Sequence, residues 1–303
     1  MANRALFGDI LEPGFREIFD DRFKEIPMKL ETLLHVNESD KQDEKDSALS
    51  GFGYLDETSE QDNIRYEDPV QMYDITYTHK KFTKGFKISE ELYEDALYNK
   101  MNKKPAALGR AARRTAEFHA AKVFNNAFDT TDQGGDAKPL CSISHPRADG
   151  GTAQSNASST GLILSEPNLE TVRLAGIKLL DDKGMKIDIE FDTLLVPVDL
   201  DKKAHELIDS GMRAGTADND MNYYKGAFRI INWIYLTSTT AWWLIDSKLH
   251  ELNWYWRVRA EFKQDDQFES GSALFKCRER FSKGFSDWRG VHGSKGDGAA
   301  YAS

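Results

Sequence analysis

The most reactive side chains of this sequence gather in one loop, where Cys141, Ser142, Ser144 and His145 lie within five positions. A thiol and an imidazole spaced C-x3-H could begin a metal site, but a zinc site takes three or four ligands. The histidines elsewhere show no matching spacing, so the sequence predicts neither a metal nor a cofactor. Ser142 and Ser144 lack the G-x-S-x-G turn that exposes a hydrolase nucleophile. We therefore interpret His145 as a structural residue of this loop.

Other candidate motifs lack the context that their chemistry requires. Gly134-Gly135 and Gly150-Gly151 carry no Lys-Ser/Thr after them and do not join a strand to a helix, as a phosphate-binding loop would. The pairs Asp181-Asp182 and Asp265-Asp266 are typical of solvated turns rather than of paired acid and base catalysts. No catalytic residue is predicted, and we expect that the chain is not an enzyme.

Length and composition indicate a globular protein with a large core. The 303 residues suffice for one large domain or two modest ones, and 40% of them are hydrophobic. A membrane span would need about 18 consecutive apolar residues, and none is present. Two cysteines fit a reducing compartment better than a disulfide scaffold. A formal charge of −10 argues against a surface built to grip nucleic acid.

The longest helical pattern runs from Lys104 to Phe128, and we expect the other elements to be organised around it. Pro105 suits a first helical turn, where its missing N–H would have no partner. Apolar residues recur every three or four positions and form one stripe: Leu108, Ala111, Ala112, Thr115, Phe118, Ala121, Phe124 and Phe128. Charged residues are expected on the other side: Arg110, Arg113, Arg114 and Glu117. The rod would be roughly 36 Å long.

The segment before this helix divides into an apolar N-terminus, a strand and a long polar stretch. Residues 1–29 could form one or two short helices broken at Pro13-Gly14. These helices could be an ordinary part of the core or could dock on a partner. Residues 30–36 are predicted to be a strand. The polar stretch that follows contains Gly51-Phe52-Gly53-Tyr54-Leu55, which is too apolar for a solvated linker, so we expect an extended excursion that packs on something.

Strands and helices then mix through the rest of the chain, which predicts an α+β fold. Residues 72–88 read as strand with a slip around His79-Lys80-Lys81. A helix is predicted from Ser165 to Gly184. Strict alternation from Leu252 to Phe262 predicts a strand with Arg257 and Arg259 on its polar side, and Phe275, Cys277 and Phe281 continue the sheet.

The order of these pieces resembles the major capsid protein of tailed bacteriophages, the Hong Kong 97 fold, and within it the Mu-like major head subunit group. The matching motifs are the polar excursion ending in Tyr73-Asp74-Ile75, the SEEL helix, the long helix, LCSISHP, SEPNLE, LLVP at 194–197, the loop ending in Asn222, and WWLID at 242–246. The resemblance implies an N-terminal arm (1–27), an E-loop and peripheral domain with the spine helix (28–164), an axial domain (165–245) and C-terminal strands returning to the peripheral domain (246–303).

The resemblance also implies a function. The chain would self-assemble into pentamers and hexamers of an icosahedral shell that encloses a phage double-stranded DNA genome, without binding the DNA specifically and without a membrane. It would belong to the virion and assemble in the host bacterial cytoplasm, with a portal, decoration proteins and a separate scaffold as possible partners, since only a short arm precedes the fold. An encapsulin-type nanocompartment and a soluble α+β hydrolase are the alternatives.

Contacts between subunits are expected where opposite charges gather. In the resembled family the E-loop lies over a neighbouring subunit. The excursion here carries Asp56, Glu57, Glu60 and Asp62. We expect these carboxylates to face Arg110, Arg113 and Arg114 on the spine helix of the neighbour.

Overall fold

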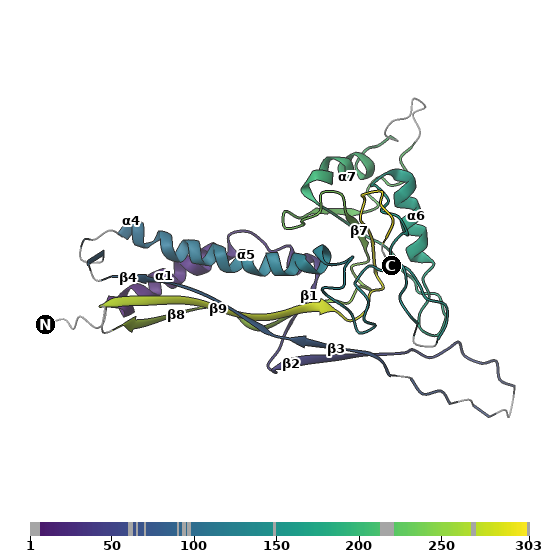
Figure 1. Cartoon of the computed structure of the whole chain (residues 1–303), viewed down its shortest axis with the longest axis horizontal. Coiled ribbons are helices and arrows are strands. Elements are labelled where there is room, and N and C mark those ends of the chain that lie inside the picture. Colours follow the sequence, from purple (N-terminus) through teal and green to yellow (C-terminus); the bar gives the residue numbers. More distant parts are fainter. Residues whose placement is uncertain are drawn as a thin grey trace. The chain divides into compact units, whose positions relative to one another are not determined.

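The computed structural model describes residues 7–59, 63–64, 66–69, 71–89, 91–92, 95, 98–147, 150–212, 221–267 and 271–301. Its contacts divide the chain into two compact units. Unit 1 comprises Met1–Glu44, Tyr77–Ala120 and Trp254–Lys283, and unit 2 comprises Lys45–Thr76, Ala121–Asn253 and Gly284–Ser303. Helices and strands are mixed in both units, which confirms the predicted α+β class (Figure 1).

Unit 1 is built on a four-stranded sheet in the order β1-β8-β9-β4. These strands span His35–Glu38, Leu252–Gln267, Ser272–Phe285 and Lys80–Ile88. Strand β4 runs antiparallel to β9, with Lys80 opposite Phe281 and Ile88 opposite Ala273. The helices of this part are α1 (Phe7–Lys24), α2 (Leu30–Leu33), α4 (Tyr98–Met101) and α5 (Lys103–Asn125). The predicted SEEL helix falls partly outside the described residues, since residues 90, 93–94 and 96–97 are not among them.

Helices α1 and α5 run alongside this sheet and bury their apolar sides against it (Figure 1). Phe15 and Phe19 of α1 are 2% and 0% exposed, and the Phe15 and Phe275 ring centroids are 5.1 Å apart. A Cβ on Gly109 of α5 would lie 2.5 Å from the Phe19 carbonyl oxygen, so the two helices touch through their backbones at this glycine. Helix α1 is therefore part of the core of its own chain.

The predicted break at Pro13-Gly14 is wrong, since α1 continues through both residues. Proline inside a helix removes one hydrogen bond and costs about 3 kcal/mol. Leu11 before the proline and Phe15 after it both pack on the same core cluster. Burial of several aromatic side chains outweighs that cost, because each contributes about 1.5–3 kcal/mol.

Helix α5 is the predicted spine helix, and its buried stripe differs in detail from the expected one. Ala116 and Ala120 are fully buried, whereas Phe118 is 44% exposed. Glu117, expected on the polar side, is 2% exposed, and its Oε1 accepts a hydrogen bond of 3.2 Å from the backbone N–H of Leu30. The stripe is therefore rotated towards the segment that leads into α2. This rotation explains why a carboxylate is buried and a phenyl ring is not.

Overpacking of the interface between α5 and the sheet of unit 1 gives a testable prediction. Ala112 is 6% exposed and belongs to the core cluster of unit 1. Ala112→Trp is expected to lower the free energy of unfolding by about 1–3 kcal/mol, since an indole ring is large enough to displace the neighbouring core side chains. Thermal denaturation would measure this change. Ala107→Trp is the matched control, because Ala107 is exposed on the same helix; equal melting of the two variants would contradict the prediction.

The segment between α1 and β4 differs from the expected strand in one part and agrees in another. Residues 30–33 form α2 rather than a strand, because Leu30 and Leu33 turn into the core, and β1 begins only at His35. Strand β2 (Asp43–Leu49) pairs with β3 (Gln71–Thr78). The predicted slip is confirmed at His79, which separates β3 from β4. Its ring nitrogens lie 3.0 Å from the hydroxyls of Ser39 and Ser282, and burial lowers its pKa.

Unit 2 contains a second four-stranded sheet, in the order β10-β7-β5-β6. These strands span Val291–Ser294, Trp242–Ile245, Thr193–Val196 and Arg229–Asn232, with β5 parallel to β6 and antiparallel to β7. Every residue of β5, β7 and β10 is buried, as residues of a strand are when both faces of the sheet are covered. Helices α6 (Glu166–Ile177) and α7 (Asp201–Ile208) and the short 3-10 helix η2 (Val198–Leu200) complete the unit.

The helix predicted from Ser165 to Gly184 ends earlier, at Ile177. The backbone N–H of Leu180 donates to Oε1 of Gln154 instead of to a helical carbonyl. Gly184 has a φ of 79°, and Asp181 closes a turn with the N–H groups of Lys183 and Met185. Among the helices that the structure describes, none is long and apolar enough to cross a membrane.

Candidate functional site

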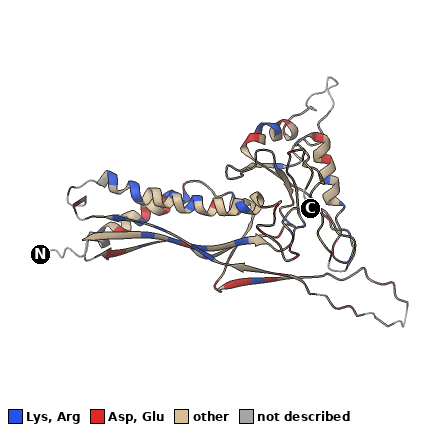
Figure 2. Cartoon of the chain, in the orientation of Figure 1, with Lys and Arg blue, Asp and Glu red and all other residues tan. Residues whose placement is uncertain are grey.

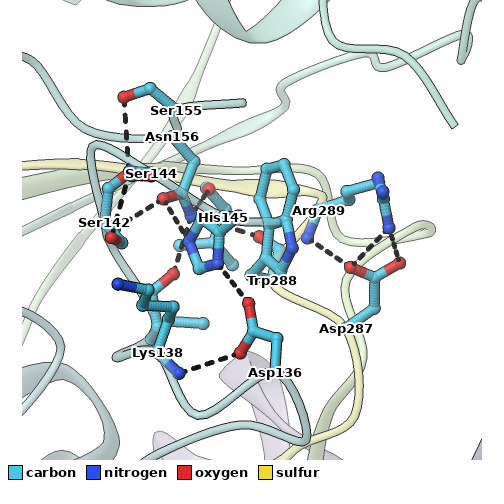
Figure 3. Close-up of polar contacts among 12 residues, drawn as sticks. Asp136, Lys138, Ser142, Ser144, His145, Ser155, Asn156, Asp287, Trp288 and Arg289 are labelled. Atoms are coloured by element: carbon cyan, nitrogen blue, oxygen red, sulfur yellow. Dashed lines mark hydrogen bonds and ion pairs between the residues drawn. The ribbon is translucent and has the colours of Figure 1, made fainter. Parts of the chain in front are cut away.

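The loop with the reactive side chains is a buried hydrogen-bond network (Figure 3). His145 is fully buried, its Nδ1 lies 2.6 Å from Oδ2 of Asp136, and its Nε2 lies 3.1 Å from Oδ1 of Asn156. Its ring stacks on Trp288 at 4.1 Å. The Asn156 amide also donates to the carbonyl oxygens of Leu140 and Val291. Both ring nitrogens therefore have partners, and the network holds three chain segments together.

Cys141 does not join His145 in a ligand set. Its thiol is fully buried, and burial raises its pKa far above the ordinary value, so the nucleophilic thiolate is disfavoured. A Cβ on Gly293 would lie 2.7 Å from its Sγ, which shows how tightly the thiol is packed. In the parts of the chain that the structure describes, no group of three His, Cys, Asp or Glu side chains could hold a metal ion.

One of the two aspartate pairs differs from the expected solvated turn. Asp182 is 9% exposed, and its Oδ1 accepts a hydrogen bond of 3.0 Å from Nη2 of Arg289. The same guanidinium bonds both carboxylate oxygens of Asp287, as Figure 3 shows. A buried guanidinium between two carboxylates is paired and desolvated, so the group stabilises a turn of unit 2 rather than acting as an acid or base.

Another buried carboxyl lies under the spine helix. Glu279 of β9 is 2% exposed, its Oε2 has no hydrogen-bond partner, and burial raises its pKa to about 8. It lines a hollow of about 160 Å³ together with Ala111, Thr115 and Cys277. The sequence interpretation missed this residue, although it occupies the inward position between Cys277 and Phe281 in the alternation of β9. A desolvated carboxyl with an unsatisfied oxygen is costly, and it makes this unit sensitive to pH.

The extended excursion presents five large apolar side chains to solvent. Between residues 51 and 69, the described part contains neither helix nor strand. Phe52, Tyr54, Leu55, Ile64 and Tyr66 are 56%, 78%, 98%, 71% and 94% exposed. Large apolar side chains gathered on one surface mark an interaction site. We call residues 51–69 the exposed arm. Within unit 2, Glu67 of this segment is paired with Nζ of Lys183, but these apolar side chains stay exposed, so the prediction that the segment packs on something is met only in part.

The charged residues that were expected to join subunits differ in their exposure and in their contacts. Asp56 and Glu57 are exposed on the arm, and Glu60 and Asp62 lie outside the described residues. Arg110 and Arg114 are exposed on α5. Arg113 is half-buried and donates to the carbonyl oxygens of Ile26 and Pro27, at 2.8 and 3.0 Å. The Arg113 guanidinium therefore fixes the segment after α1 within its own chain, a role that the sequence pattern did not indicate.

Comparisons with known proteins agree on one family. The family model described as phage capsid protein matches residues 73–293. The procapsid of bacteriophage JBD30 has a TM-score of 0.53 at 16% identity, covering 94% of this chain and 74% of that chain. The capsid of the same phage reaches 0.56 at 16% identity, covering 70% and 92%. The virus-like particle from Pyrococcus furiosus reaches 0.54 at 10% identity, covering 93% and 98%. No curated protein matches the sequence.

At these identities the structural matches show the fold, and they confirm the predicted Hong Kong 97 type. The family match adds what the fold does not show, because it covers well over half of the sequence. It also agrees with the arrangement of side chains: the reactive groups of the Cys141–His145 loop are buried in a structural network, and several highly exposed apolar side chains lie on the exposed arm. The chain belongs to the phage capsid protein family.

Proposed function

We propose that this chain forms the pentamers and hexamers of an icosahedral shell that encloses the double-stranded DNA genome of a tailed phage. The single observation that supports it best is the exposed arm, whose Leu55 is 98% exposed and whose Tyr66 is 94% exposed. A capsid subunit needs interfaces on several sides, and apolar side chains exposed in the monomer become buried when such interfaces close. A portal, a scaffold and decoration proteins would be its partners in the virion, and assembly would occur in the host bacterial cytoplasm.

The arm is proposed to act between subunits by charge as well as by apolar contact. Asp56 and Glu57 adjoin Leu55, so a basic surface on a neighbour is the natural counterpart. Arg110 and Arg114 remain candidates for that surface because they are exposed. Each exposed pair contributes only about 0.2–1 kcal/mol, yet many such contacts close together in a shell.

Sedimentation and electron microscopy of the purified chain test this function. The expected result is closed shells, whereas a chain in which a short Gly-Ser linker replaces residues 51–69 is expected to stay folded and remain as small species. Circular dichroism would verify that the shortened chain is folded. If the unaltered chain remains a monomer under all assembly conditions, including with its scaffold, the proposal is wrong.

A shell that encloses a protein cargo is the second candidate. It corresponds to the encapsulin-type alternative of the sequence analysis, and the likeness that covers 98% of the Pyrococcus furiosus chain is to a particle described as virus-like. Nuclease treatment of shells from producing cells separates the two candidates, since a genome container protects DNA of uniform length and a cargo container protects protein instead.

A further inference from the structure

The hollow beside Glu279 lies entirely within unit 1, between the spine helix α5 and strands β4 and β9. We call it the carboxyl hollow. Its volume is about 160 Å³, and short side chains of α5 leave this space, at Ala111, Ala112 and Thr115. An apolar cavity of about 150 Å³ in a protein core can hold a benzene molecule. The carboxyl hollow therefore has room for a ligand of about six non-hydrogen atoms.

The carboxyl hollow has a buried floor and an exposed rim. Leu108, Cys277 and Glu279, which line it, are 6%, 4% and 2% exposed. Thr83 and Lys84 also line it and are exposed. A molecule that passes the rim therefore meets aliphatic and thiol surface and one carboxyl. A concave, mostly apolar surface with a few polar groups is typical of a binding site for a small molecule.

Glu279 is the polar group of this floor that lacks a partner. Among the described residues, its Oε2 has no hydrogen-bond partner. The side chains around it do not supply one, because Phe82 is opposite Glu279 in the register and the Thr115 hydroxyl donates to the carbonyl oxygen of Ala111. Buried polar atoms are nearly always hydrogen-bonded, so this exception calls for an explanation. A ligand in the carboxyl hollow would provide it.

The carboxyl of Glu279 is neutral at physiological pH, which limits the kind of ligand that fits. Burial raises its pKa to about 8, so the group keeps its proton below that pH. A neutral carboxyl donates through its O–H and accepts at its carbonyl oxygen. The other titratable groups near it are Lys84, the Cys277 thiol, whose pKa is raised to about 12, and His119, whose ring centroid lies 4.5 Å from that of Phe82.

The two elements at the mouth of the carboxyl hollow are basic, which disfavours a cationic ligand. The charged residues of β4 are all Lys, and those of α5 are Lys or Arg apart from Glu117 (Figure 2). A cation would therefore meet like charge at the rim. It would also require Glu279 to ionise, and the desolvation of both charges would offset their attraction.

We propose that the carboxyl hollow binds a small neutral ligand that carries a primary amide on a short branched alkyl group. The amide N–H would donate to one oxygen of Glu279, and the amide carbonyl would accept the O–H of the other. The alkyl group would replace water against Leu108 and Ala112. This inference goes beyond the proposed function, because the site lies within one copy of the chain and needs no neighbour.

Other small ligands fit the carboxyl hollow less well. A carboxylic acid ionises at a pH of about 4 and would bring an unpaired negative charge to the buried floor. An alcohol has its donor and its acceptor on one atom, which cannot face both oxygens of Glu279 with good geometry. A primary amide is uncharged and presents the donor and the acceptor side by side.

Binding of isobutyramide to the unassembled full chain tests the proposal. Ligand-observed NMR at pH 7 is expected to show saturable binding, and the melting temperature should rise with the concentration of the amide. Glu279→Leu removes the hydrogen-bonding group, and Ala111→Leu fills the hollow, so each should weaken binding at least about tenfold. Ala107→Leu is the matched control, because Ala107 is exposed on the same helix, and should bind normally. Circular dichroism of each variant verifies folding.

The pH dependence of binding is the second test, and it uses Glu279→Gln. Glutamine offers a donor and an acceptor at every pH, so this variant should bind isobutyramide equally at pH 7 and pH 9. The unaltered chain should lose affinity about tenfold per pH unit above pH 8, as Glu279 loses its proton. The measurements stay above pH 7, where histidine side chains are ordinarily neutral.

Three results would overturn the proposal. No binding by the unaltered chain would leave the carboxyl hollow to water. Equal binding by Glu279→Leu would place the amide elsewhere. Binding of isobutylammonium that strengthens as pH rises, without binding of isobutyramide, would assign Glu279 to a cation. None of these results depends on the formation of shells, so the proposed function stands or fails separately.

Discussion

Replacement of Phe19 by alanine is expected to lower the free energy of unfolding by about 3–5 kcal/mol. Phe19 is fully buried, and its ring centroid lies 5.3 Å from that of Phe262 and 6.3 Å from that of Phe23. Its removal leaves a cavity between α1 and the sheet that the rigid strands cannot fill. Fluorescence of Trp254 and Trp256, which lie in unit 1, would follow the transition. Phe118→Ala is the matched control, since that ring is 44% exposed.

Deletion of residues 1–24 should act in the same direction and more strongly. The sequence pattern allowed α1 to be an arm that docks on a neighbour, in which case the shortened chain would remain folded and only its assembly would fail. The burial of Phe15 and Phe19 in their own chain predicts unfolding of unit 1 instead. A shortened chain that keeps its tryptophan fluorescence and melting temperature but forms no shells would restore the interpretation as an arm.

Glu279→Gln is expected to stabilise the chain at alkaline pH and to leave it unchanged near pH 4. The folded protein holds the pKa of Glu279 at about 8 because the carboxyl is buried, whereas the ordinary value is 4.5. The folded state therefore binds a proton that the unfolded state has lost between these pH values. Stability must fall as pH rises through this window, by about 1.4 kcal/mol per unit and about 3–5 kcal/mol in total by pH 8.

Glutamine removes this dependence because it has nearly the same shape and no charge. Denaturant unfolding from pH 5 to 8 would measure the difference between the two proteins at each pH. Glu57→Gln is the control, since Glu57 is exposed. If the two proteins differ in free energy of unfolding by the same amount at every pH in this range, Glu279 is ionised in the folded protein. Other interactions then offset the free-energy cost of burying its charge.

The long elements could be predicted because their periodicity is set by burial on one side. The alternation around Trp254 and Phe275 and the stripe of α5 are examples. The surface on which α1 packs could not be predicted, since an amphipathic helix has the same pattern whether its own sheet or a neighbour covers it. Glu117 and Arg113 were misplaced for a related reason: their partners, at Leu30 and at Ile26, lie far away in the sequence.

The cationic side of the unit 1 sheet, formed by β4, β8 and β9, could not be predicted from the sequence pattern. Alternation placed Arg257 and Arg259 on one side of β8, but it could not show which strands lie beside it. The face forms only because β4 pairs with β9, although almost 200 residues separate them along the chain. Strand order is a tertiary property, and so is any surface that several strands share.

The position of β4 at the end of its sheet has a consequence for the pool of unassembled chains. An end strand presents unpaired backbone groups, and a second copy could add to it in an open series that ends in fibres instead of a closed particle. Lys80, Lys81, Lys84 and Lys87 are all exposed on this strand. Strand addition would strip water from these ammonium groups and bring like charges together, so fibre growth is disfavoured. The four lysines thus favour closed assembly over an open series of copies joined at this strand.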